Sequence, residues 1–271
     1  MTRVSTIVFF HAHPDDEASQ TSGTMTLASR RGHRVVVVYG TNGEHGESPD
    51  DLAEGESLVA RRRAEAAASA QVTGAARVAW LGYSDSGMTG WEQNASEGNF
   101  HTADLDEAAG RLAAILDEED ADVLVGYDWH GGYGHPDHVK VHHVAHRAAE
   151  LAARRPRMLE ATMNRDHMRG LFALAVELGM GPDDGGFDVD GPADDGNPFG
   201  TPENELHWAV DISEAIDAKR EALACHRSQT TDIGMFLAIP LEHFRTGFGR
   251  EFFIEPGRAP GMVAGWPFDQ E

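Results

Sequence analysis

Short apolar runs alternate with segments of helical spacing through the first half of the chain, and this alternation restricts the fold more than any other feature. The runs at residues 4–10, 33–39 and 122–127 are rich in β-branched and aromatic side chains, and each leads, directly or after a loop, into a helical pattern. Such short, uniformly apolar runs are typical of parallel strands that are buried on both faces. The sequence therefore predicts an α/β fold with a Rossmann-like, mostly parallel sheet and helices on both faces.

The pattern is weaker after residue 155. A loop rich in glycine, proline and aspartate at residues 181–205 separates segments that are too few to bury a core of their own. We therefore expect one domain over residues 1–271, in which residues 1–155 form the core and residues 156–271 complete it. The strands expected in this second part are residues 158–163, 207–210 and 251–254, and the helices are residues 164–178 and 213–224.

The formal net charge of −23 argues against two classes of partner. Nucleic acids and anionic membrane surfaces both select basic patches, so we expect neither as a partner. No apolar stretch approaches the ~20 residues of a membrane span, and residues 4–10 lack a cleavage site, which favours a cytoplasmic protein. Cys225 is the single cysteine, so a metal site would have to use histidine and carboxylate. Homo-oligomers are left open.

Two clusters of histidine and aspartate stand where predicted strands give way to helices. They read His11-Ala12-His13-Pro14-Asp15-Asp16-Glu17 and Gly131-Gly132-Tyr133-Gly134-His135-Pro136-Asp137-His138. Ligands of parallel sheets bind beyond the carboxyl ends of the strands. We therefore expect both clusters at this edge, where they would form one active site.

The first cluster offers two metal ligands and a base. His13 and Asp16 lie three residues apart across a turn, so they can converge on one ion while Asp15 points elsewhere. With His138 they form a set of two histidines and one carboxylate, which leaves positions open for water and substrate. Asp15, beside the metal-bound water but not bound to the metal, is then placed to act as general base.

Three other residues invite a functional interpretation. His142 lies four residues after His138, so it either faces the same metal or lies outside the ligand set. His11 either orients a ligand or is buried for structural reasons. His226 follows Cys225 directly, but neighbours in a helix do not face each other, so a nucleophile pair is not expected.

The two motifs resemble those of the LmbE-like, or PIG-L, family of metal-dependent N-acetylglucosaminyl deacetylases. The marks of that family are a strand-ending Ala-His-Pro-Asp-Asp-Glu and a later His-Pro-Asp-His, and both are complete at residues 12–17 and 135–138. The resemblance is closest to the mycothiol-pathway members. It extends to Gly43-Glu44-His45-Gly46-Glu47, Asp85-Ser86-Gly87-Met88 and Gly131-Gly132-Tyr133-Gly134, and it covers residues 4–155 better than the remainder.

The resemblance implies a role for each motif residue. The metal, by expectation Zn²⁺ although another divalent ion such as Fe²⁺ also fits, would be held by His13, Asp16 and His138, with Asp15 as base. A protonated His135 would stabilise the oxyanion or protonate the leaving amine, Asp137 would tune that imidazole, and Tyr133 would assist the tetrahedral intermediate. The residues implied to contact the sugar are Arg62, Asp85, Glu44, Glu47 and Met88.

The sequence thus predicts a hydrolase that removes the N-acetyl group from a small molecule containing N-acetylglucosamine. An alternative within this class is an amidase for a larger glucosamine amide, such as a mycothiol-type conjugate or an acylated antibiotic sugar. Two histidines and one aspartate also form the ligand set of non-haem Fe(II) oxygenases, but those ligands usually lie on a β-barrel as His-x-Asp/Glu. A sugar-binding protein without catalysis is the remaining alternative.

Overall fold

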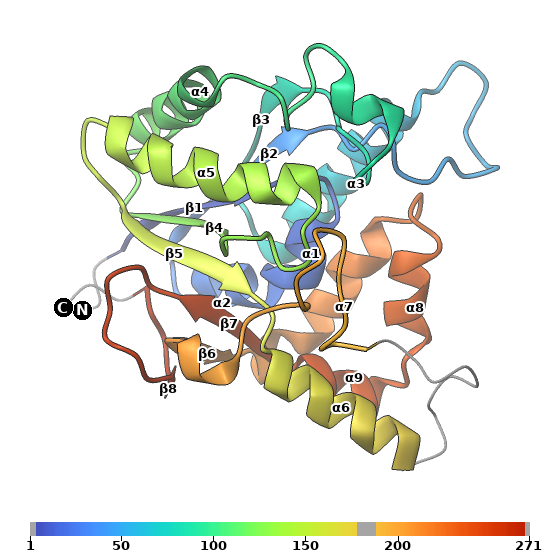
Figure 1. Ribbon diagram of the computed structural model, residues 1–271, viewed down its shortest axis with the longest axis vertical. Helices are drawn as coiled ribbons and strands as arrows, with labels where there is room; N and C mark the ends of the chain where they lie inside the picture. Colours follow the sequence, from blue (N-terminus) through green and yellow to red (C-terminus); the bar gives the residue numbers. More distant parts are fainter. Residues whose placement is uncertain (1–3, 178–187, 269–271) are drawn as a thin grey trace.

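The computed structural model describes residues 4–177 and 188–268 (Figure 1). Its strands are β1 (Thr6–His11), β2 (Arg34–Thr41), β3 (Arg77–Tyr83), β4 (Val123–Tyr127), β5 (Arg157–Thr162), β6 (Trp208–Asp211), β7 (Arg250–Ile254) and β8 (Val263–Ala264). Its α-helices are α1 (Asp16–Gln20), α2 (Ser22–Arg30), α3 (Leu58–Thr73), α4 (Leu105–Glu118), α5 (Pro136–Leu151), α6 (Arg165–Glu177), α7 (Ile216–Cys225), α8 (Asp232–Ala238) and α9 (Leu241–Phe248). Short 3-10 helices are η1 (Glu92–Ala95), η2 (Glu203–Glu205) and η3 (Ser213–Ala215).

Within the described residues, the strands form one sheet in the order β3-β2-β1-β4-β5-β7-β6-β8. Neighbouring strands from β3 to β5 are parallel, as the short apolar runs predicted. β7 is antiparallel to both β5 and β6, and β8 is parallel to β6. The sheet is therefore mostly parallel, with one antiparallel strand in its C-terminal half that the sequence did not indicate.

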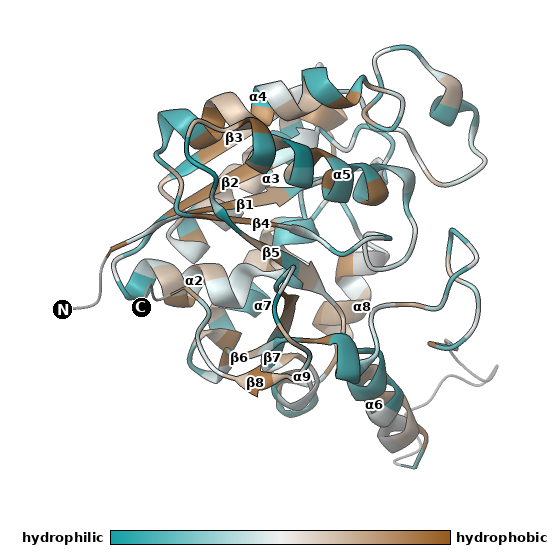
Figure 2. Ribbon diagram, turned by 60° about the vertical axis from the view of Figure 1, so that its left-hand side comes forward, coloured by the Kyte–Doolittle hydropathy of each residue, from teal (hydrophilic) through white to brown (hydrophobic). Residues whose placement is uncertain are grey.

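Helices cover both faces of the sheet (Figure 1). On one face α4 packs against α5, which contacts β4 and β1, while α1, α2, α3 and α7 pack together on the other. The strands between them are among the most hydrophobic segments of the chain (Figure 2). Residues 35–38 of β2, for example, are at most 1% exposed, as expected for a strand covered on both faces.

The C-terminal part is tied to the N-terminal part by a buried carboxylate. Glu251 of β7 accepts hydrogen bonds from the backbone N–H groups of Gly23 (3.0 Å) and Thr24 (2.7 Å) in the first turn of α2. It also pairs with Lys219 of α7 at 2.7 Å. A carboxylate at a helix N-terminus satisfies otherwise unpaired N–H groups, so this contact joins α2, α7 and β7.

Several sequence-based boundaries were wrong. The helical pattern that follows residues 4–10 is divided at Thr21 into two helices, α1 and α2, and α8 and α9 were not predicted at all. Leu178 and residues 181–187 of the predicted loop lie outside the described residues. None of the described helices is long and apolar enough to cross a membrane.

The strand order places both clusters at a topological switch point. The chain runs from β1 outward through β2 to β3 and then returns to β4 on the other side of β1. The crevice outside the carboxyl ends of such strands is where open α/β sheets bind ligands. β1 ends at His11, the first residue of the first cluster, and β4 ends at Tyr127, four residues before the second cluster, so each cluster lies at the carboxyl end of one of these strands.

Candidate metal centre

His13, Asp16 and His138 come together at the switch point. His13 Nδ1 lies 3.4 Å from Asp16 Oδ2, and His138 Nε2 lies 3.3 Å from Asp16 Oδ1, so that the carboxylate bridges two imidazoles. Each of the three residues is at most 8% exposed. Ligands held about 2 Å from a tetrahedral zinc ion lie roughly 3.3 Å apart. Each of these two contacts therefore has about the length expected between ligands of one ion.

The two nitrogens of His138 have different surroundings. Nδ1 lies 3.1 Å from the carbonyl oxygen of Gly131, which places the ring proton on Nδ1. Nε2 is buried and has no hydrogen-bond partner among the described residues. A buried lone pair that faces a carboxylate is suited to a cation, and a backbone carbonyl commonly orients such an imidazole from behind. These residues therefore fit a divalent metal ion.

The other nitrogen of His13 faces two more carboxylates. Nε2 lies 3.2 Å from Asp137 Oδ2 and 3.5 Å from Asp85 Oδ1. Burial would lower the pKa of His13, but Asp85, Asp137 and Asp16 raise it well above its usual value. An Nε2 proton directed at Asp137 leaves Nδ1 facing Asp16, as in carboxylate–histidine–metal arrangements. Ser86, whose role the sequence did not indicate, donates to Asp137 from its backbone N (2.8 Å) and its Oγ (2.5 Å).

Asp15 lies in a strained turn beside this cluster. Its φ of 101° is a left-handed value, which costs a residue with a side chain on the order of 1–3 kcal/mol. Its backbone N donates to Glu17 Oε2 (3.0 Å), and its Oδ2 accepts from Arg62 Nη2 (2.8 Å). Burial raises the pKa of Asp15 to about 6 although the Arg62 charge opposes this shift. A carboxyl group with such a pKa can accept a proton near neutral pH.

Arg62 and Glu17 support the Asp15 turn through buried hydrogen bonds. Arg62 is 3% exposed and also donates to the carbonyl oxygens of Gly43 (2.6 Å) and Pro14, so its guanidinium supports the turn, although the resemblance had implied a sugar contact. Glu17 is 1% exposed and accepts from Ser69 Oγ and His226 Nε2, both at 2.6 Å.

The pairing of Glu17 with His226 could not be found from sequence spacing, because 209 residues separate them. His226 is fully buried, and the one partner considered for it from the sequence, the adjacent Cys225, was not expected to face it. Burial would raise the pKa of Glu17, but the imidazole and the Ser69 hydroxyl lower it to about 2. The first turn therefore rests on an ionised, buried carboxylate.

His135 begins α5 and is directed toward the cluster. Its ring centroid lies 4.8 Å from that of His13 and 5.1 Å from that of His138. Its Nδ1 accepts a hydrogen bond from the backbone N of Asp137 (3.1 Å), which leaves the proton on Nε2. Burial and the two neighbouring imidazoles lower the pKa of His135 well below its usual value. The structure thus favours a neutral His135, where we had expected a protonated one.

The role implied for Asp137 also changes. Its carboxylate contacts Ser86 and His13, whereas its contact with His135 is made by the backbone N. A carboxylate in this position orients the imidazole of His13, because it accepts from the nitrogen that faces away from Asp16. The carboxylate of Asp137 therefore contacts His13, whereas the resemblance had implied that it tunes His135.

Tyr133 lies on the glycine-rich turn before α5. Its ring is edge-on to His138 with centroids 4.9 Å apart, and it stacks with Phe199 at 6.2 Å and 25°. The turn is bound to the loop that precedes β6, because Asp194 N donates to Tyr133 O (2.9 Å) and Gly200 N donates to Gly132 O (2.7 Å). Part of the C-terminal loop therefore borders the site.

The residues implied to contact a sugar are not all directed at the cluster. Asp85 reaches His13 and accepts backbone hydrogen bonds from His45 (3.1 Å) and Gly87 (2.8 Å). Glu44 has a buried Oε2 without a hydrogen-bond partner in the described structure, and Met88 is half-buried on the same loop as Asp85. The carboxylate of Glu47 instead accepts from Thr230 Oγ1 (2.9 Å) and Thr231 N (2.8 Å), after α7.

His11 and His142, the two other histidines singled out from the sequence, have separate partners. His11 Nδ1 lies 2.9 Å from Tyr127 Oη and its Nε2 lies 3.0 Å from Thr21 Oγ1, while burial lowers the pKa of His11 to about 4. His11 is therefore a buried, neutral, fully hydrogen-bonded side chain. His142 lies against Tyr127 O and Glu160 rather than facing Asp16 with His138.

Comparison with known proteins agrees with this geometry. The family described as PIG-L: GlcNAc-PI de-N-acetylase matches residues 8–149. The chain belongs to this family. A 1D-myo-inositol 2-acetamido-2-deoxy-alpha-D-glucopyranoside deacetylase from Nocardioides sp. is 35% identical to it over 93% of this chain and 92% of that protein. A protein of the same name from Thermobispora bispora is 34% identical over 96% of this chain and 91% of that protein.

A solved structure shows the same fold. The N,N'-diacetylchitobiose deacetylase from Pyrococcus horikoshii matches 93% of this chain and 82% of its own with a TM-score of 0.57, at 22% identity. The sheet with helices on both faces is thus the fold that the first half of the sequence predicted. It differs from the β-barrel on which non-haem Fe(II) oxygenases usually carry their ligands.

Proposed function

We propose that this chain is a zinc-dependent deacetylase that hydrolyses the N-acetyl group of an N-acetylglucosamine linked to an inositol. The observation that carries the proposal is the buried, unpaired Nε2 of His138, which faces the same carboxylate as His13. Family membership and the named activity of the Nocardioides sp. relative support hydrolytic deacetylation of an N-acetylglucosamine compound. A cytoplasmic location remains a prediction of the sequence.

The proposed ligands are His13 Nδ1, one or both oxygens of Asp16, and His138 Nε2. Potential ligand atoms of His135, His13 and His138 lie within 4.8 Å of one another, but Nδ1 of His135 already accepts from the backbone of Asp137. We therefore assign His135 to contact with the substrate rather than with the metal. A bound zinc ion would lower the pKa of a water ligand toward ~7 and polarise the acetamide carbonyl. Asp137 and Ser86 keep His13 in the required tautomer.

The remaining chemistry is proposed for Asp15, His135 and Tyr133. Asp15 accepts the proton of the attacking water, and the charge of Arg62 keeps its carboxylate in place. The Nε2–H of neutral His135 and the Tyr133 hydroxyl donate hydrogen bonds to the oxygen that gains negative charge. One such donor contributes about 3–4 kcal/mol to transition-state stabilisation in other hydrolases. Asp15 then returns its proton to the leaving nitrogen, so acetate and a free amine result.

The extent of the acyl group is open in this proposal. Asp85, Glu44 and Met88 remain candidates for sugar contacts, because they lie on the loops beside His13. A larger glucosamine amide is the second candidate substrate.

A substrate panel with acetate detection tests the proposal. Metal-free chain is reconstituted with Zn²⁺ or Fe²⁺ and given N-acetylglucosaminyl inositol, free N-acetylglucosamine, and a glucosaminyl inositol with a longer acyl group. We expect acetate and the free amine, by mass spectrometry, from the first compound and only after metal is restored. Turnover in the metal-free chain, or oxygen-dependent turnover without acetate, would contradict the proposal.

A further inference from the structure

A second group of metal-binding side chains lies on α5 and β5. His142 and His146 follow His138 at intervals of four residues, so the three imidazoles project along one face of α5. Glu160 of β5 lies opposite the last two. Potential ligand atoms of His142, His146 and Glu160 all lie within 4.8 Å of one another. We propose that these three residues, named here the α5–β5 site, bind a second divalent transition-metal ion such as Zn²⁺.

The contacts within the α5–β5 site converge on one oxygen atom. Glu160 Oε1 lies 2.6 Å from His146 Nε2 and 3.5 Å from His142 Nδ1, and the two imidazole centroids are 4.5 Å apart. Ligands of a tetrahedral zinc ion lie roughly 3.3 Å from one another. The short contact must therefore open slightly, and the side chain of His146 can move because it is 33% exposed.

The electrostatics of the α5–β5 site favour a divalent cation. Glu160 is 7% exposed and, in the part of the chain that the structure describes, it pairs with these two imidazoles and with no lysine or arginine. Two imidazolium groups against one carboxylate would bring like charges together in a mostly buried place. A divalent ion instead binds the imidazoles in their neutral form, releasing the proton of any imidazolium, and it satisfies the buried carboxylate.

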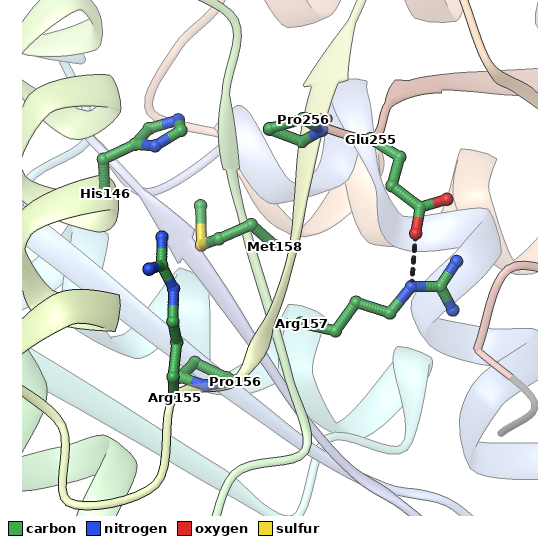
Figure 3. A pocket seen from close by; sticks show the side chains of 7 residues that line it. All are labelled: His146, Arg155, Pro156, Arg157, Met158, Glu255 and Pro256. Atoms are coloured by element: carbon green, nitrogen blue, oxygen red, sulfur yellow. Dashed lines mark hydrogen bonds and ion pairs between the residues drawn. The ribbon is translucent and has the colours of Figure 1, made fainter. Parts of the chain in front are cut away.

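The local structure holds one ligand and leaves access to another. The Nδ1–H of His142 donates to the carbonyl oxygen of Tyr127 (3.0 Å), which restrains the plane of the ring and leaves Nε2 as its ligand atom. His146 lines a surface pocket together with Arg155, Met158 and Pro256, through which an ion can enter (Figure 3).

Three charged residues, Arg155, Arg157 and Glu255, also line this pocket. Arg155 lines the same pocket as His146, but it is exposed and can turn toward solvent (Figure 3). Glu255 is engaged by Arg157 at 2.6 Å. Two histidines and one glutamate leave a fourth tetrahedral position, which water from the pocket can occupy.

The α5–β5 site is separate from the proposed catalytic ligands. His146 lies eight residues after His138, which corresponds to about 12 Å along a helix. A metal ion there would join α5 to β5, and its presence can be measured without any assay of turnover. The inference therefore stands apart from the proposed deacetylation.

The experiment counts zinc ions per chain. Metal-free wild-type chain and variants are dialysed against buffered Zn²⁺ alone, and the bound metal is measured by elemental analysis. We expect two ions in the wild type, one in His146→Ala, one in His138→Ala, and none in the double variant. Zinc should also raise the melting temperature of His138→Ala but not that of the double variant.

His143→Ala is the matched control, because it removes an exposed imidazole of the same helix that is not part of the α5–β5 site. It should keep two ions. Glu160→Gln retains the shape of the side chain, so it tests the site even if His146→Ala does not fold. Circular dichroism checks the fold of each variant.

Wild-type zinc content in both His146→Ala and Glu160→Gln would overturn the inference. So would a single zinc ion in the wild type that disappears in His138→Ala. If the deacetylase proposal alone is wrong, the wild type still binds two ions but releases no acetate.

Discussion

The two turns that build the candidate site are held by different kinds of contact. The turn after β1 is held by charged side chains, since Arg62 bonds the carboxylate of Asp15 and Glu17 accepts from its backbone N. The turn after β4 is held by hydrogen bonds to its backbone, since Gly200 N of the loop before β6 donates to Gly132 O (2.7 Å) and the buried carboxylate of Asp128 accepts from Gly132 N (2.9 Å). The first turn thus depends on an ion pair, and the second on backbone hydrogen bonds and close packing.

The difference assigns different tasks to the two turns. Paired charges can keep a carboxylate ionised, as a general base requires, and they can hold a residue at a strained φ. Glycines allow close approach instead, because a Cβ on Gly131 would lie 2.2 Å from His138 Cβ. Substitutions that change charge should therefore damage the first turn, and substitutions that add volume should damage the second.

The largest effect is expected where the two turns meet. His13→Ala in the first turn and His138→Ala in the second should each reduce metal content at the proposed catalytic site and abolish measurable acetate release, since each removes a proposed ligand. Metal analysis beside the acetate assay tests this. Full retention of catalytic metal in either variant would show that the turns do not share an ion.

Asp15→Asn should lower kcat by about 10²–10⁴ while metal content and folding are retained, because asparagine tolerates a positive φ but cannot accept the proton. Burial raises the pKa of Asp15 to about 6, and the base must be ionised. The wild-type rate should therefore rise with pH through about 6 and level off above it. This acidic limb should be absent from the residual activity of the variant, and its persistence would assign the limb to another group.

Glu17→Gln should destabilise the fold by about 3–5 kcal/mol at pH 7, because it leaves His226 without its buried partner. The folded pKa of Glu17, about 2, lies below its ordinary value of 4.5. The stability it contributes is therefore complete above pH 4.5 and is lost as the pH falls toward 2. His226 has a raised pKa, so its contribution is complete below 6.5 and is lost as the pH rises through the folded value.

Urea unfolding at a series of pH values measures these contributions. The Glu17→Gln profile should lose the decline between pH 4.5 and 2. Ser69→Ala is the matched control, since it removes one neutral donor from the same carboxylate and should cost only about 1 kcal/mol. Equal losses in both variants would mean that charge does not hold this turn.

Gly131→Ala should have the smallest effect of the four, destabilising the chain by roughly 1–3 kcal/mol through its φ of 62° and the contact with His138. Zinc affinity at the proposed catalytic site should weaken with it, because His138 must move. Gly110→Ala in α4 is the control, since that position has open space and should gain helix stability. Calorimetry of zinc binding distinguishes a displaced ligand from a general loss of stability.

The sequence predicted the parts of the molecule whose causes are local. Residues 35–38 read as a buried strand because four valines stand together, and His13, Asp16 and His138 could be placed at one edge because parallel strands end together. The convergence of these three residues is what the structure shows.

The parts that were missed are decided by contacts between distant segments. β7 is antiparallel because of its neighbours β5 and β6, and its five residues carry no sign of direction. Arg62 was expected at the sugar, but its guanidinium is buried under Pro14 and Asp15. Which carboxylate reaches which imidazole, as for Asp137 and His13, depends on side-chain directions that spacing does not determine.

The central position of β1 also determines the order in which its contacts can form during synthesis. β1 can pair with β2 as soon as the first crossover has emerged, but its other edge waits for β4, and His13 waits for Asp137, 124 residues later. Long-range pairing of this kind forms late and slowly. A nascent chain that ends after β3 therefore exposes one edge of β1 and carries two of the three proposed ligands, His13 and Asp16. Enclosure of the proposed catalytic ion would mark the moment at which the two halves of the sheet have joined.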